Sequence, residues 1–192
     1  MPRATTPRQN TPPHLPAAAG LQVPVNVPYR PMVEAVAKRF KEDLDAPDHP
    51  LVVLNTIAPT SSVHIAVIWD KWKELAIPQR GRVITDAYAA AHPHSRLVVR
   101  FPMGLTPGEA LSQGYLRYQI IPLVRPTDHV TPRQLKEAMA SAGGVLMRVG
   151  NDQQLRFATR AQAEEAYRRL LEKINKPIWT LSEETSSSDM AE

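Results

Sequence analysis

Three arginines in strand-like segments are the residues with the clearest binding chemistry. Residues 116–124, 145–149 and 154–158 are rich in β-branched and apolar residues, and they hold Arg117, Arg148 and Arg156. Side chains alternate between the two faces of a strand, and each arginine is out of phase with the main apolar set of its strand. We therefore expect the three arginines to share one uncovered sheet face, a surface suited to RNA or single-stranded nucleic acid.

More positive charge is expected along the last helix of this region. That helix would carry Arg160, Arg168 and Arg169. Residues 115–178 hold eleven basic and six acidic side chains, a surplus of five, whereas residues 32–114 are balanced. The excess favours a polyanionic partner, such as a nucleic acid or a ribonucleoprotein assembly. A solvated basic surface without a ligand is the alternative interpretation.

Two tryptophans indicate a second kind of function. Trp69 and Trp72 lie at the end of an apolar strand, and if exposed they would form a hot spot for a protein partner. They would otherwise complete the core. The competing hypothesis is therefore a protein–protein adaptor or assembly subunit that uses this corner and the proline-rich N-terminal arm.

Residues for enzyme chemistry do not form a convincing set. The chain has no cysteine, which excludes disulfides, thiolate metal sites and cysteine catalysis. It has no P-loop, dinucleotide-binding glycine fingerprint or Gly-x-Ser-x-Gly elbow. His92 and His94 lack a third ligand at useful spacing. We predict a non-enzymatic protein with no catalytic residue, no metal site and no cofactor.

The elements that position these residues fall into two units of an α+β protein. In residues 32–113, apolar periodicity and proline positions predict the order α-β-β-α-β-α, with a hairpin of 51–57 and 63–69. In residues 115–176 the order is β-α-β-β-α. Capping boxes begin three of the helices, at Thr106, Thr131 and Thr159.

The first unit resembles the BolA-like family. The resemblance rests on the apolar strand 63–69, the basic pair of Pro78-Gln79-Arg80-Gly81-Arg82, the strand at Leu97-Val98-Val99 and the helix start Thr106-Pro107-Gly108-Glu109. It implies an α/β fold related to the second topological type of KH domain. It also implies, as a third function, partnership with a glutaredoxin through an iron–sulfur cluster. The family's signature histidines are replaced here by Gly81 and by Val98-Val99.

The two ends differ in composition from the rest. Residues 1–31 contain eight prolines, Arg3 and Arg8 and no acid, which predicts a flexible arm and leaves organelle targeting open. Residues 182–192 are rich in serine and acids, so we expect a disordered tail. No apolar run is long enough for a membrane span, and we expect an intracellular, cytoplasmic protein.

Overall fold

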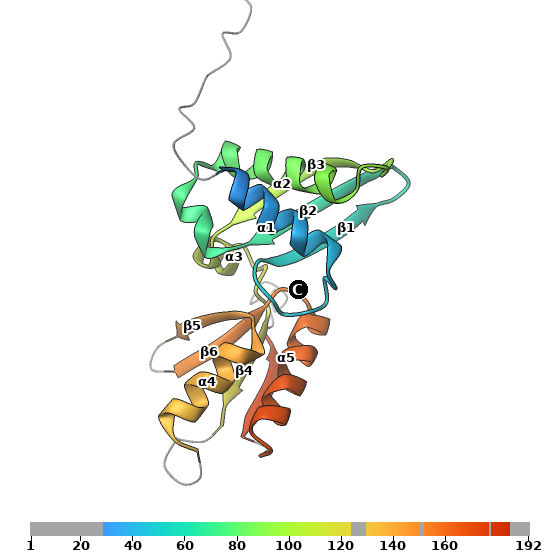
Figure 1. Ribbon diagram of the computed structural model, residues 1–192. Helices are drawn as coiled ribbons and strands as arrows, with labels where there is room; N and C mark the ends of the chain where they lie inside the picture. The colour runs from blue at the N-terminus through green and yellow to red at the C-terminus, as the bar shows by residue number, and fades with distance from the viewer. Residues whose placement is uncertain (1–28, 124–129, 150–151, 177, 185–192) are drawn as a thin grey trace, which may run out of the picture.

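The computed structural model describes residues 29–123, 130–149, 152–176 and 178–184, which form two α/β units, one above the other in Figure 1. The first unit contains α1 (Tyr29–Lys41), β1 (Leu51–Ile57), β2 (Ser62–Ile68), the 3₁₀ helix η1 (Asp70–Glu74), α2 (Ile77–Ala91), β3 (Val98–Leu105) and α3 (Pro107–Ser112). The second contains β4 (Tyr118–Pro122), α4 (Pro132–Ala142), β5 (Val145–Val149), β6 (Asp152–Phe157), α5 (Arg160–Lys173) and β7 (Trp179–Glu183). The predicted α+β class is confirmed.

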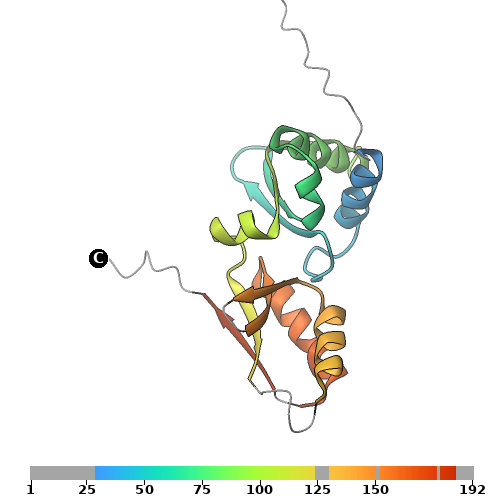
Figure 2. The ribbon, with the colours of Figure 1, turned by 90° about the vertical axis from the view of Figure 1, so that its left-hand side faces the viewer.

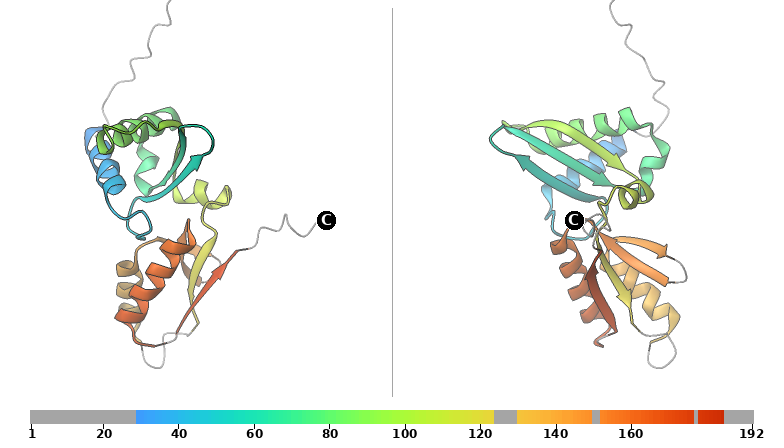
Figure 3. Two further views of the ribbon diagram at one scale, coloured as in Figure 1. Left: turned by 90° about the vertical axis from the view of Figure 1, so that its right-hand side faces the viewer. Right: turned by 180° about the vertical axis from the view of Figure 1, so that it is seen from behind.

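The first unit has a three-stranded sheet with α1 and α2 on one face and the short α3 at the inner end of the other. Its strand order is β1-β2-β3, with β1 and β2 antiparallel and β2 and β3 parallel. Val63, Ile65 and Val67 of β2 are fully buried in the same cluster as apolar residues of α1 and α2. The opposite face carries no helix over its outer half, as the right panel of Figure 3 shows.

The second unit has a four-stranded antiparallel sheet in the order β5-β6-β4-β7. Leu155 and Phe157 of β6 bury one face of it against α4 and α5. The residue pattern did not predict β7, whose Trp179 is 3% exposed in this core. Ser182 and Glu183 pair with β4, so the expectation of a disordered tail from residue 182 is wrong for these two residues. The pairing with β4 and the ion pair of Glu184 with the buried Arg156 hold this end of the strand in place.

The helix starts follow the expected capping chemistry with one exception. The Thr106 and Thr131 side chains accept hydrogen bonds from Glu109 N and Gln134 N. In turn, the Glu109 and Gln134 side chains accept hydrogen bonds from the backbone N–H groups of Thr106 and Thr131. Thr159 accepts from Gln162 N. The Gln162 side chain does not return to Thr159, because its Nε2 donates to the carbonyls of Leu44 and Val52 in the first unit, at 3.1 Å each.

The two units pack against each other through a small shared core. Leu51, Ile68 and Leu105 of the first sheet form one buried cluster with Leu116 and Val145 of the second unit. Arg169 of α5 adds a two-pronged ion pair with Asp48, at 3.0 and 3.3 Å. These hydrogen bonds hold the pKa of the Asp48 carboxyl below its usual value. Figure 2 shows the loop before β1 reaching down to the second unit.

The prediction that residues 29–31 belong to a flexible arm is wrong, because these residues are part of α1. Residues 1–28 and 185–192, which make up most of the predicted arm and tail, lie outside the described residues. In the described part of the chain, no helix has both the length and the apolar character needed to cross a membrane.

Candidate functional site

Arg156 is not part of an exposed patch. It is 3% exposed, and its guanidinium donates to Gln154 Oε1 (3.0 Å), to the Leu116 carbonyl (3.4 Å) and to the Glu184 carboxylate. A buried guanidinium needs such partners, because leaving it unpaired costs several kcal/mol. Arg156 is therefore a structural residue that ties β6 to the end of β7.

Arg148 is exposed but lies on the other face of the sheet. The register pairs Val145 with Arg156 and Arg148 with Gln153, so Arg148 shares the face of Leu146 and Leu155. The prediction that Arg148 shares a face with Arg156 is wrong for a physical reason. The apolar set of β5 begins with Val145, which packs not on α4 and α5 but on the first unit. The predicted single patch of Arg117, Arg148 and Arg156 is therefore not formed.

The arginines of α5 are engaged by carboxylates. Arg160 pairs with Glu164 at 2.7 Å, which raises the pKa of Arg160. Arg168 pairs with Glu165, and Arg169 pairs with both Glu165 and Asp48. Because each of these positive charges has a carboxylate beside it, the three arginines add little net positive potential to the surface. The exposed pairs are weak, and a ligand can compete for them. Their nucleic-acid role stays a prediction.

The tryptophan corner is part of the core rather than an exposed hot spot. Trp72 is fully buried and its Nε1 donates to the Val67 carbonyl at 2.8 Å. Trp69 is 9% exposed and meets Trp72 edge to face, with ring centroids 5.5 Å apart. Lys71 Nζ lies over the Trp69 ring, 5.1 Å from its centroid. Of the two alternatives for these tryptophans, the structure therefore supports a place in the core, and the prediction that they form an exposed partner-binding pair is wrong. Trp69 also lines a cleft described below.

One aromatic ring, that of Phe101, is instead exposed on the face of the first sheet opposite α1 and α2, and three partly buried side chains continue from it. Phe101 is 56% exposed, and its ring lies 6.1 Å from that of His64, its partner on β2. His64 Nε2 lies 3.1 Å from Met103 Sδ, and Tyr115 donates to the same sulfur at 3.4 Å. Phe101, His64, Met103 and Tyr115 thus form a continuous row from the outer end of the sheet toward the second unit.

This row leads into a groove of about 420 Å³ between the two units. Its lining includes Asn55, Gln113, Tyr115, Arg117 and Tyr118, and it contains no carboxylate. Glu184, whose N–H donates to the Arg117 carbonyl at 2.8 Å, directs its own carboxylate to Arg156. We call the row and the groove together the sheet groove. Arg117 is the one predicted site residue that lies in it.

A β-bulge in β3 explains why the alternation of residues did not predict the exposure of Phe101. Val63 pairs with Val99, but His64 pairs with Phe101, so Arg100 is the extra residue. Val99 and Phe101 are two positions apart and would share a face on a regular strand. The bulge instead leaves Val99 on the helix side and turns Phe101 to the uncovered face. No sequence signal marks this extra residue.

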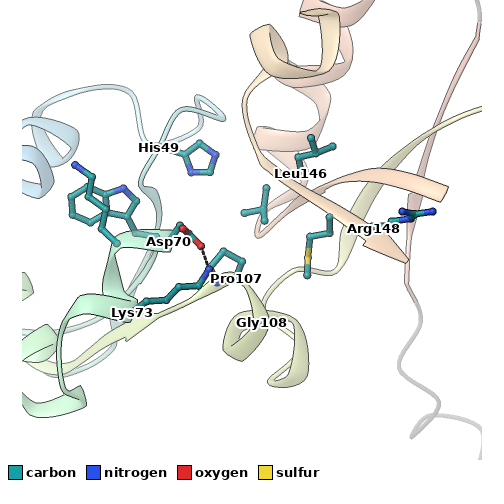
Figure 4. Close-up of a pocket in the computed structure, with 11 residues that line it drawn as sticks. His49, Asp70, Lys73, Pro107, Gly108, Leu146 and Arg148 are labelled. Carbon is teal, nitrogen blue, oxygen red and sulfur yellow. Dashed lines mark ion pairs between the residues drawn. The ribbon is translucent and has the colours of Figure 1, made fainter. Parts of the chain in front are cut away.

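A second hollow, the junction cleft, lies between the units on another side. Its volume is about 660 Å³, and its apolar walls come from Trp69, Pro107, Val145, Leu146 and Met147, with Arg148 at the end of the last segment. Asp70, Lys71 and Lys73 of η1 and His49 also line it. Figure 4 shows the ion pair of Asp70 with Lys73 on one wall and the residues of β5 on the other.

The described residues include no group of three or more histidine, aspartate or glutamate side chains that could hold a metal ion. The arrangement of the two hollows instead supplies stacking rings, cations and apolar walls, which suit binding.

Comparison with known proteins gives no relative: no family model, no curated protein and no solved structure matches the chain. The resemblance of residues 32–113 to the BolA-like family therefore stays a prediction, and so does the iron–sulfur partnership that it implies.

Proposed function

We propose that the protein is a non-enzymatic binding protein whose sheet groove holds single-stranded nucleic acid, as a component of a ribonucleoprotein assembly. The observation that carries the proposal is the half-exposed ring of Phe101 on the outer half of a sheet face that carries no helix there. It lies beside His64, at one end of the row that continues through Met103 to Tyr115. Aromatic side chains on an open sheet accept stacked bases of any sequence.

The charges around the sheet groove are consistent with a phosphate backbone. Arg100 projects from the bulge next to Phe101, and Arg117 lines the far end of the groove. Both are exposed, and neither has an acidic side-chain partner among the described residues. Cations at the two ends of an aromatic row can neutralise phosphates while the bases stack between them.

The test is fluorescence anisotropy of a labelled single-stranded RNA of about 12 nucleotides, a length typical of such sites. Phe101→Ala should weaken binding about 5- to 100-fold, the usual loss for one stacked base. Arg100→Gln and Arg117→Gln should each reduce the slope of log affinity against log salt by about 0.7.

Arg133→Gln is the matched control, because Arg133 is exposed on α4 and pairs with Glu137. Its affinity and salt slope should equal those of the wild type. If the wild-type protein does not bind RNA at low salt, or if Phe101→Ala binds as well as the wild type, the proposal is wrong. An effect of Arg133→Gln equal to that of Arg117→Gln would mean that binding follows net charge rather than a site in the sheet groove, and would contradict the proposal.

A further inference from the structure

We propose that the junction cleft binds an extended, acidic peptide segment of a partner protein, which adds as a strand to the free edge of β5. This site is separate from the sheet groove and does not depend on the proposed RNA binding.

The backbone of β5 faces the cleft. Four consecutive residues, 145–148, line it, although consecutive side chains of a strand point to opposite faces. A hollow that is lined by side chains from both faces of the strand must run along the edge of the strand. In the described part of the chain, β5 has a strand partner only on the β6 side, so its other edge offers unpaired N–H and C=O groups. Such an edge is a template for another strand.

The start of this edge is fixed in place. Gly144 N donates to the Pro47 carbonyl at 2.7 Å, and His49 Nε2 lies 2.5 Å from the Gly144 carbonyl. The loop before β1 therefore closes the edge before Val145, and beyond Val145 the side chains of Leu146 and Arg148 are exposed. Leu146, at 48% exposure, provides an apolar contact for a side chain of the added strand.

The charge of the cleft selects the kind of peptide. Its lining holds three cations, Lys71, Lys73 and Arg148, and one carboxylate, Asp70, which pairs with Lys73 at 2.5 Å. Lys71 and Arg148 are exposed and have no acidic partner among the described residues. Two uncompensated positive charges beside apolar walls favour a segment in which carboxylates alternate with apolar side chains.

The probe is a fluorescein-labelled peptide of about ten residues in which valine alternates with glutamate, long enough to span a strand of ordinary length. It should bind the full chain, and backbone amide NMR shifts should concentrate on residues 145–148. The double variant Lys71→Glu with Arg148→Glu should weaken binding at least about tenfold. The control variant Lys136→Glu with Lys173→Glu changes the net charge equally at exposed positions outside the cleft, and it should bind as the wild type does.

Backbone methylation tests the strand addition itself. Only every second N–H of an added strand points to β5. N-methylation of all valines and N-methylation of all glutamates should therefore have opposite outcomes: one peptide loses binding and the other keeps it. Phe101→Ala should bind the peptide normally, which separates this result from the RNA test.

Four outcomes would overturn the proposal. They are the absence of peptide binding, equal effects of the two methylation patterns, tighter binding after removal of residues 185–192, and a dimer that Arg148→Glu dissociates. The third would assign the cleft to the protein's own acidic tail, and the fourth to a second copy of the chain.

Discussion

At the scale of single residues, the same amino acid has different roles in this protein according to its partners. Arg117 and Arg148 are exposed, whereas Arg156 is buried and holds Gln154 and Glu184 in place. Arg80 resembles Arg156: it is 7% exposed and donates to the carbonyls of Leu75 and Gly104 and to the Glu109 carboxylate. The hydrogen bond from Thr106 N and the contact with Arg80 keep the pKa of Glu109 below its usual value.

This difference predicts unequal effects of arginine substitution. Arg156→Gln should lower the free energy of unfolding by about 1–3 kcal/mol, because the Leu116 carbonyl and the Glu184 carboxylate lose their donor. Arg148→Gln should change it by less than about 0.5 kcal/mol, as is usual for exposed positions. Urea unfolding followed by circular dichroism measures both. Equal stability of the two variants would contradict the structural role of Arg156.

At the scale of elements, the turn between α4 and β5 decides where the free edge of β5 lies. Gly143 and Gly144 both have positive φ, 82° and 75°, a region that side chains with a Cβ rarely adopt. A Cβ at Gly144 would overlap the ring of Phe157. The sequence predicted a helix end at this pair. It did not indicate that the turn must also pass against Phe157 and the Pro47 carbonyl.

Gly144→Ala should therefore cost more than backbone strain alone. We expect a loss of about 3 kcal/mol in unfolding free energy, from the positive φ together with overpacking against Phe157. Gly114→Ala is the matched comparison, since Gly114 has a φ of 71° and open space around its Cα. It should lose only about 1 kcal/mol. Thermal unfolding of both variants gives the answer, and a loss as small for Gly144→Ala as for Gly114→Ala would rule out the predicted clash.

At the scale of the whole molecule, the two units are joined by contacts that a reading of each unit alone does not predict. Gln162 is fully buried and donates from α5 to two carbonyls of the first unit. The shared core at Leu51, Ile68 and Val145 covers the inner end of the first sheet. We therefore expect the units to unfold together in one transition.

Substitution of Gln162 tests this coupling. Gln162→Ala should lower the unfolding free energy by about 2 kcal/mol, because two buried carbonyls lose their donor. Gln162→Glu should lower the unfolding free energy further at neutral pH, because its carboxylate would face the same two carbonyls. We expect this loss although glutamate suits the third position of a capping box. Calorimetry that shows two separate transitions in the wild type, or a Gln162→Glu variant more stable than the wild type, would refute the coupling.

The local sequence determined the helices, most of the strands and the caps of this protein. Apolar periodicity and the pairs Thr106–Glu109 and Thr131–Gln134 act within a few residues, so their outcome is readable without a partner. Tertiary structure decided which face each strand turned to its surroundings. The sequence allows Val145 to pack either on α4 and α5 or on the first unit. Val145 packs on the first unit, and with this register Arg148 and Arg156 lie on opposite faces of the sheet. The bulge at Arg100 likewise turned Phe101 outward, because register depends on the neighbouring strand and not on the strand's own residues.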